Sequence, residues 1–184
     1  MSDKSILTIC GSLRKASINR ALMETLPELS PEGMRFVEAP SFAEFPHYNG
    51  DLAAESGIPA GVVALGDAVR AADGVIFVSP EYNYSIPGAL KNAIDWLSRL
   101  PDPPFKMKPV AIQSAAPGMI GGARMQYHLR QTLVFLDATV FTRPEVFVSQ
   151  AMQKVEGGRL TDQPSRDAVA AQLAAFAMFI DQVS

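Results

Sequence analysis

The chain alternates between short apolar runs and longer amphipathic stretches, and this alternation constrains its fold more than any other feature. The apolar runs are rich in β-branched side chains, which is typical of strands buried on both faces of a sheet. The run at 35–38 is weaker and predicts an edge strand, and Pro144 interrupts the last strand region. The predicted strands cover residues 6–10, 35–38, 75–78 and 110–112 and the shared region 139–141 with 146–148.

The amphipathic stretches predict helices, because apolar residues recur in them at the spacing of one helix face. Ser17 is the predicted N-cap of the first helix, Pro59 suits the first turn of the second, and Gly157–Gly158 predicts a tight turn before the last. Strands and helices that alternate in this way predict an α/β fold with a parallel sheet covered on both faces. The helical residues lie within 17–26, 58–72, 87–97, 123–136 and 169–180.

The overall composition sets limits on function. The 184 residues contain no repeat or linker, so we expect a single domain over residues 1–184, and the lone Cys10 excludes a disulfide within the chain and is expected to be a buried structural thiol. The net charge of -3 is mild and interspersed, which argues against a nucleic-acid partner. We expect no metal site, because His47 and His128 have no cluster of ligands around them. No signal peptide or long apolar run occurs, so we expect a cytoplasmic protein with no membrane partner.

The loop after the first strand predicts a phosphate site. In a parallel sheet, ligands bind outside the carboxyl ends of the strands, and a helix start favours an anion. Ser12 and Ser17 add hydroxyls, Asn19 adds an amide and Arg14 adds a guanidinium suited to phosphate. The loop lacks the glycines of a dinucleotide-binding loop and the G-K-[ST] ending of a triphosphate loop. A plain polar turn with a capping serine is the alternative.

The loops after the third and fourth predicted strands suit a flat ligand. Residues 79–88 combine two prolines with two tyrosines and an asparagine, which offers rigid apolar surface and backbone donors for a planar heterocycle such as isoalloxazine. The alternative is a rigid turn whose tyrosines cap the core. Residues 114–122 are small and glycine-rich, so their backbone can approach a ligand closely.

Three motifs in these loops resemble those of a known family. They are G-S-L-R-K-x-S-x-N at 11–19, P-E-Y-N-Y-S-I-P-G-A-L-K-N-A-I-D-W at 80–96 and I-G-G-A-R-x-Q-Y-H-L-R at 120–130. The chain resembles the NADPH-dependent FMN reductase family, and within it the bacterial quinone and chromate reductases. This resemblance implies a flavodoxin-like three-layer sandwich with a five-stranded parallel sheet of order 2-1-3-4-5, one flavin mononucleotide (FMN) per subunit, and a homodimer or homotetramer.

The same resemblance implies which residues bind the cofactor. Ala115, Ala116 and Pro117 lie where relatives often carry polar residues, so contacts there are expected from backbone rather than from side chains. Tyr84, Met119 and Ile120 are expected to border the ring beside a second subunit. The expected FMN-binding residues are Ser12, Leu13, Arg14, Ser17, Ile18, Asn19, Pro80, Glu81, Tyr82, Asn83, Ser114, Ala115, Ala116 and Gly118.

The expected activity is electron transfer from NADPH or NADH to small acceptors such as quinones, free flavin or chromate, by a ping-pong mechanism. We expect no catalytic side chain, because the cofactor carries the chemistry, and we expect Glu81 to order its loop. Arg124, Tyr127 and His128 form either a subunit contact or a solvated helix face. The alternatives are a flavodoxin-type carrier that does not turn over NAD(P)H, and a domain that binds another phosphorylated ligand. The sequence leaves the acceptor and the choice of NADH or NADPH open.

Overall fold

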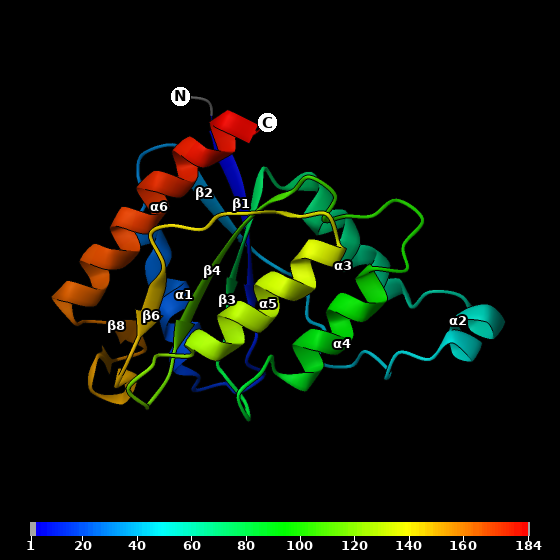
Figure 1. Ribbon diagram of the computed structural model, residues 1–184, viewed down its shortest axis with the longest axis horizontal. Coiled ribbons are helices and arrows are strands. Elements are labelled where there is room, and N and C mark those ends of the chain that lie inside the picture. The colour runs from blue at the N-terminus through cyan, green and yellow to red at the C-terminus, as the bar shows by residue number, and fades with distance from the viewer. Residues whose placement is uncertain (1–2, 184) are drawn as a thin grey trace.

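The sheet is built around β1 (Lys4–Cys10), which pairs in parallel with β2 (Met34–Glu38) on one side and β3 (Gly74–Val78) on the other. The computed structural model describes residues 3–183, and Figure 1 shows this sheet running through its centre. β3 pairs with β4 (Pro109–Ala115), whose two ends pair with β5 (Thr139–Val140) and β6 (Val146–Val148). The order β2-β1-β3-β4-β5 confirms the predicted flavodoxin-like topology, with β5 and β6 sharing the fifth position.

Helices cover both faces of the sheet, as the sequence predicts. α1 (Ile18–Leu29) and α6 (Gln163–Val183) lie together on one face, and α3 (Ala60–Ala71), α4 (Gly88–Leu97) and α5 (Ala123–Phe135) lie on the other (Figure 1). Side chains of each strand alternate between the two resulting cores: in β3, Val75 and Phe77 face one and Ile76 and Val78 face the other. All five residues of β3 are buried, which explains its uninterrupted apolar sequence.

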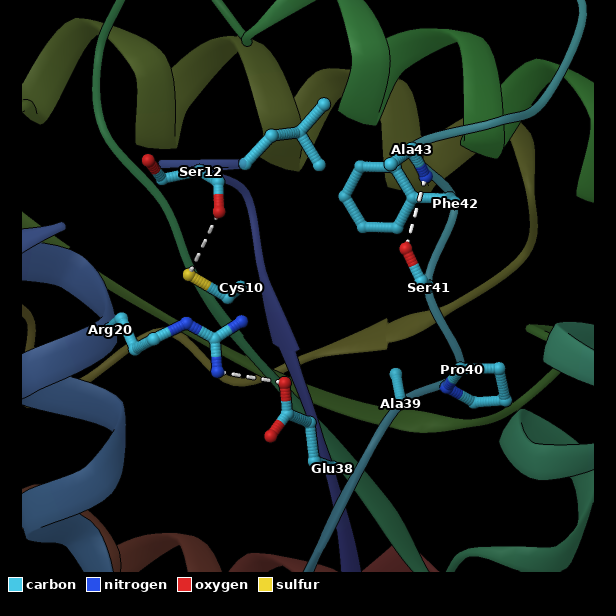
Figure 2. A pocket seen from close by; sticks show the side chains of 10 residues that line it. Cys10, Ser12, Arg20, Glu38, Ala39, Pro40, Ser41, Phe42 and Ala43 are labelled. Carbon is cyan, nitrogen blue, oxygen red and sulfur yellow. Dashed lines mark hydrogen bonds and ion pairs between the residues drawn. The ribbon is translucent and has the colours of Figure 1, made fainter. Parts of the chain in front are cut away.

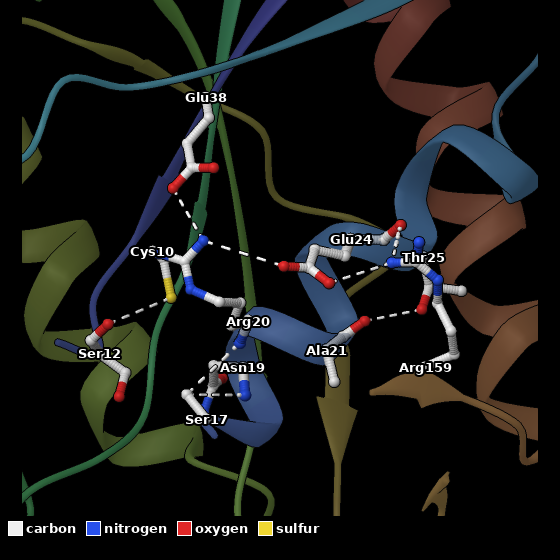
Figure 3. A network of polar contacts seen from close by, with 10 residues as sticks. All are labelled: Cys10, Ser12, Ser17, Asn19, Arg20, Ala21, Glu24, Thr25, Glu38 and Arg159. Carbon is white, nitrogen blue, oxygen red and sulfur yellow. Dashed lines mark hydrogen bonds and ion pairs between the residues drawn. The ribbon is translucent and has the colours of Figure 1, made fainter. Parts of the chain in front are cut away.

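A small hairpin extends the layer that contains α1. β7 (Val155–Glu156) and β8 (Arg159–Leu160) pair antiparallel across the predicted Gly157–Gly158 turn, after the short 3₁₀ helix η1 (Ala151–Gln153). Figure 3 shows Arg159 reaching α1, where its Nη1 donates to the Glu24 backbone oxygen at 2.9 Å. The Leu160 amide donates to the Thr25 hydroxyl at 3.0 Å, so two contacts fix the hairpin on the helix.

Two features of the fold were not predicted. Helix α2 (Gly50–Ser56) lies in the long connection between β2 and α3. It buries none of its residues, so the sequence there has no apolar periodicity from which a helix could be predicted. The strand predicted at 110–112 extends to Ala115 because Gln113 and Ser114 are fully buried within β4. Within residues 3–183 no single helix has the length and apolarity to cross a membrane, although α2 and α3 pass that test when taken together as a sharply bent pair.

The backbone at Gly11 approaches β3 too closely for a side chain. A Cβ at this position would overlap the Ser79 hydroxyl and lie 2.6 Å from the Ser79 Cβ. We predict that Gly11→Ala lowers the free energy of unfolding by about 1–3 kcal/mol through overpacking. Urea denaturation measures this loss. Gly88→Ala is the control, because within residues 3–183 an added Cβ at Gly88 meets nothing within 4 Å; equal effects of the two substitutions would contradict the prediction.

Candidate functional site

The carboxyl ends of β1, β3 and β4 meet at one edge of the sheet and enclose a cavity of about 230 Å³. Its walls come from the three loops that the sequence singles out, together with one residue of η1. The cavity is lined by Ser12, Arg14, Ala16, Ser17, Ile18, Asn19, Pro80, Glu81, Tyr82, Ala115, Ala116, Pro117 and Met152. Parallel pairing alone brings these segments together, although they are distant in sequence.

The loop before α1 presents donors to this cavity. Ser17 has extended backbone and caps the helix, its hydroxyl oxygen accepting from the amides of Asn19 and Arg20 at 3.2 and 3.4 Å (Figure 3). The amides of Ala16, Ser17 and Ile18 have no acceptor among residues 3–183. These amides and the positive end of the α1 dipole favour an anion at this place.

Arg14 is the cation of the loop. Its side chain is exposed and lines the cavity, and it forms no ion pair with any carboxylate of residues 3–183. Ser12 is buried, and its hydroxyl oxygen accepts from the Arg14 amide at 3.4 Å, which helps to hold the turn. Arg14 therefore keeps its guanidinium available for a ligand, in the geometry that suits a phosphate.

Asn19 joins the first loop to the end of β4. Its side-chain amide donates to the Ala115 backbone oxygen, and its side-chain oxygen accepts from the Ala115 amide, both at 2.9 Å. Asn19 lines the cavity with little of its surface, because only 1% of the residue is exposed. The sequence analysis assigned Asn19 only to a phosphate, but its main contacts in the structure are with the backbone of β4; one side-chain N–H remains for a ligand.

The loop after β3 is held in a tight turn at the cavity edge. Tyr82 and Ser85 exchange two backbone hydrogen bonds of 3.0 Å, and the two residues between them, Asn83 and Tyr84, both have positive φ. This is the geometry of a primed hairpin turn, which asparagine tolerates and tyrosine adopts rarely. The Arg124 guanidinium lies 3.7 Å above the Tyr84 ring, a contact that stabilises the strained position.

Glu81 connects the same loop to the start of α5. One carboxylate oxygen accepts from Arg124 at 3.1 Å, and the other accepts from the Met125 amide at 3.3 Å. A carboxylate at a helix N-terminus is stabilised by the free amides and by the dipole. Both oxygens of Glu81 are thus engaged in ordering the loop, as the sequence analysis expected for this residue.

The loop after β4 is supported from below by a buried polar pair. The Ser114 hydroxyl donates to the Gly121 backbone oxygen at 2.6 Å, and the Gln126 side-chain amide donates to the Ser114 hydroxyl at 2.8 Å. Gly122 has positive φ, and a Cβ there would lie 2.8 Å from the Ser114 Cβ, so the glycine permits the close approach. Ala115 and Ala116 meet the cavity, while the Ser114 side chain holds the loop in position.

Most of the predicted site residues line one cavity, and four do not. Leu13 faces a neighbouring cavity, Ser114 is fully buried, and Asn83 and Gly118 lie in the loops outside the lining. The sequence analysis missed Ala16, Pro117 and Met152. Ala16 and Pro117 belong to the predicted loops and were recoverable as neighbours, but Met152 is exposed on η1, far from any motif, and no sequence signal identifies it.

The titratable groups near the site supply no acid–base pair. Cys10 is buried in β1, as expected, and burial raises the pKa of its thiol, so the neutral form is favoured at neutral pH. Within residues 3–183 no three His, Cys, Asp or Glu side chains form a group able to hold a metal ion. The arrangement can bind an anion at the start of α1 and a flat group between the loops after β3 and β4.

The Asn19–Ala115 pair generates a prediction. Asn19→Ala leaves the buried N–H and C=O of Ala115 without their partners, so we expect the free energy of unfolding to fall by about 2–4 kcal/mol. Urea denaturation checks this. Asn49→Ala is the matched control: Asn49 caps exposed α2 through the Asp51 amide, and its loss is expected to cost about 1 kcal/mol or less. Similar losses for both variants would contradict the role assigned to Asn19.

Comparison with known proteins places the chain in a family. The sequence model described as NADPH-dependent FMN reductase matches residues 5–153. The chain is 52% identical to a quinone reductase of Escherichia coli K12, with 100% of this chain and 99% of the relative covered. It is 45% identical to an NAD(P)H-dependent FMN reductase of Pseudomonas aeruginosa, over 97% of this chain and 96% of the relative.

A solved structure agrees with these sequence matches. The flavoenzyme NAD(P)H:(acceptor) oxidoreductase FerB of Paracoccus denitrificans superposes with a TM-score of 0.86 at 34% identity, and 98% of each chain is covered. The family match covers all three loops of the cavity. The chain belongs to the NADPH-dependent FMN reductase family.

Proposed function

We propose that this protein is an FMN-dependent oxidoreductase that takes electrons from NAD(P)H and passes them to small acceptors, with quinones foremost. Family membership and the names of the similar proteins support this proposal. The observation that carries it is the cavity at the ends of β1, β3 and β4, where amides and a guanidinium that have no partner among residues 3–183 meet two rigid loops. FMN carries both a phosphate and a flat ring, joined by a ribityl chain.

The residues present fit FMN. The phosphate would lie at the start of α1, held by the amides of Ala16, Ser17 and Ile18, by the hydroxyls of Ser12 and Ser17 and by Arg14. The ring would lie between Pro80 to Tyr82 and the backbone of Ala115 and Ala116. The remaining predicted residues, Leu13, Asn83, Ser114 and Gly118, would act through the shape of the loops.

The protein would contribute placement and electrostatics to the reaction. FMN, when bound, would supply the redox chemistry between the nicotinamide and the acceptor, and a donor and an acceptor that occupy the same space in turn would give ping-pong kinetics. Glu81 is not a general base in this proposal, because both of its oxygens are already hydrogen-bonded. Tyr82 is half-exposed at the cavity edge and limits the access of water to one side of the ring.

We further propose that the chain acts as a single domain in the cytoplasm, where nicotinamide donors are available, and that it assembles as a homodimer or homotetramer. The support for assembly is apolar surface along α5 and the loop before it, where Phe135 is 80% and Met119 79% exposed. Apolar patches of this kind mark association surfaces. The patch comprises Tyr84, Met119, Ile120, Tyr127, Val134 and Phe135.

The phosphate contact generates a prediction. Arg14→Ala removes the only cation that lines the cavity among the described residues, so we expect the dissociation constant for FMN to rise by roughly tenfold or more, the loss of one charge-assisted contact. Titration of FMN into apoprotein by calorimetry measures it. Lys15→Ala is the control, because Lys15 is the adjacent cation and does not line this cavity. If both substitutions weakened FMN binding equally, the loss would come from the change in net charge and not from a contact between Arg14 and the phosphate.

The activity itself is tested by mixing the FMN-loaded protein with NADPH or NADH and a quinone and following the absorbance of the reduced nicotinamide. A reductase consumes the donor catalytically. Consumption of no more than one equivalent per flavin would indicate an electron carrier and would overturn the proposed function.

The α5 surface generates another prediction. Phe135→Asp places a charge in the exposed apolar patch, and we expect the molecular mass measured by analytical ultracentrifugation to fall from that of a dimer or tetramer toward that of a smaller species. Met178→Asp is the control, because Met178 is also exposed but lies on α6, on the opposite face of the sheet. A wild-type protein that sediments as a monomer would contradict the proposed assembly.

A further inference from the structure

A second cavity, of about 200 Å³, lies at the carboxyl ends of β1 and β2. It is separated from the proposed flavin cavity by the loop at 11–17, and Ser12 lines both. Figure 2 shows that one wall carries Arg20 and Glu38 and that the ring of Phe42 faces them from the segment after β2. The proposed binding of FMN involves Ser12 and Leu13 of this lining but gives no role to Arg20, Glu38 or Phe42.

The polar wall presents a donor and an acceptor side by side. Arg20 Nη1 donates to one oxygen of Glu38 at 2.8 Å, and the second Glu38 oxygen has no hydrogen-bond donor among residues 3–183. The side chains are 31% and 55% exposed, so the pair is accessible, and an ion pair at such a surface is weak enough to rearrange for a ligand. A vicinal diol, in which each hydroxyl both donates and accepts, matches this arrangement.

The opposite wall and the rim are apolar. The segment after Glu38 contributes Ala39, Pro40 and Phe42, with Ser41 as its polar member, and Leu13 projects from the loop with about half of its surface exposed. A hydroxylated sugar beside a flat base would find hydrogen-bonding groups on one wall and apolar surface on the other. The cavity therefore suits one nucleoside, and its volume is too small for a whole dinucleotide.

The position of the cavity selects one nucleoside. In dinucleotide-binding sheets, a carboxylate after the strand beside β1 accepts a hydrogen bond from the adenosine ribose, and β2 occupies that place in this sheet. The donor must also place its nicotinamide over the ring in the adjacent cavity, so its second nucleoside has to lie one pyrophosphate away. The loop between the cavities carries two exposed cations, Arg14 and Lys15, suited to that pyrophosphate and to the FMN phosphate.

We propose that this cavity binds the adenosine ribose of the nicotinamide donor, with Glu38 accepting a hydrogen bond from a ribose hydroxyl; the inference rests on the proposed function. Glu38 also repels a 2′-phosphate, whereas Arg20 attracts one once Glu38 no longer neutralises it. The Arg20–Glu38 pair thus sets the preference between NADH and NADPH. Arg20 and Glu38 would thus determine the donor specificity although neither residue lines the proposed flavin cavity.

The test substitution is Glu38→Gln in the FMN-loaded protein. The substitution weakens the acceptor for the ribose hydroxyl and frees Arg20 from its ion pair. Both effects shift the donor preference from NADH toward NADPH. We expect kcat/KM for NADH to fall and that for NADPH to rise, so that their ratio changes by about tenfold, one charge-assisted contact. The KM for the quinone and the dissociation constant for FMN stay within error of the wild type.

Glu24→Gln is the matched control. Glu24 lies 4.0 Å from the same Arg20 nitrogen and 3.2 Å from Arg159 Nη1, and it does not line the cavity, so its replacement also removes one negative charge near Arg20 but leaves the proposed ribose contact in place. A donor ratio unchanged in Glu38→Gln, or changed equally in both variants, would overturn the inference.

A binding measurement separates this inference from the proposed function. ADP-ribose, which lacks the nicotinamide, is titrated by calorimetry into the FMN-loaded wild type and the two variants. We expect it to bind the wild type and Glu24→Gln and to bind Glu38→Gln roughly tenfold more weakly. No binding to the wild type would overturn the inference even if NAD(P)H is oxidised, whereas a wild type that binds ADP-ribose but oxidises neither donor would refute the proposed function alone.

Discussion

Parallel pairing of β1, β3 and β4 is the constraint on which the whole site depends. Because the three strands point the same way, the loops that follow them emerge at one edge of the sheet, and each loop starts from a buried and rigid strand. The Asn19–Ala115 pair then fixes the distance between the first and the third of these loops. A ligand that spans both loops therefore meets a surface whose spacing is set before it binds, which reduces the entropy lost on binding.

Two arginines near the start of α1 differ in whether a carboxylate neutralises them. Arg14 has no carboxylate partner among the described residues and lines the cavity, whereas Arg20, in the first turn of α1, is paired with Glu38. The hydrogen bond with Glu38 raises the pKa of Arg20, which keeps that guanidinium charged beside the cavity at β2. The two arginines near one helix start therefore offer different surfaces: Arg14 is available to an anion, whereas Arg20 and Glu38 together present a donor and an acceptor.

The sequence predicted the fold and the site to different degrees, for physical reasons. β1, β3 and β4 could be located because burial on both faces requires an unbroken apolar run, and Ser17 could be located because a helix start needs a capping oxygen. The strand order came from family resemblance, since apolar periodicity does not say which strands are neighbours. Helix α2 was missed because it buries no residue and leaves no periodic signal.

The same limit explains the errors within the site. The family resemblance assigned Ser114 to the ligand, with contacts in this loop expected from backbone, and the structure directs its hydroxyl to Gly121 and Gln126, a pairing that depends on the tertiary structure. Met152 was missed because it is brought to the cavity by η1, after the chain has passed β6. The sequence identified which loops form the cavity, but it did not show which side chains within each loop point into it.

Two adjacent cavities with one shared wall allow the proposed reaction to recognise its donor in one place and to admit its acceptor in another. In the proposed reaction a nicotinamide donor and a quinone would use the same face of one ring in turn, yet the donor needs to be recognised and the acceptor only needs access. If recognition of the donor lies at Glu38 and Arg20, on the β2 side of the loop, the ring itself needs no donor-specific contacts. The flavin cavity can then remain open and apolar on its exposed side, bordered by Tyr82 and Met152, and accept quinones that share little beyond flatness.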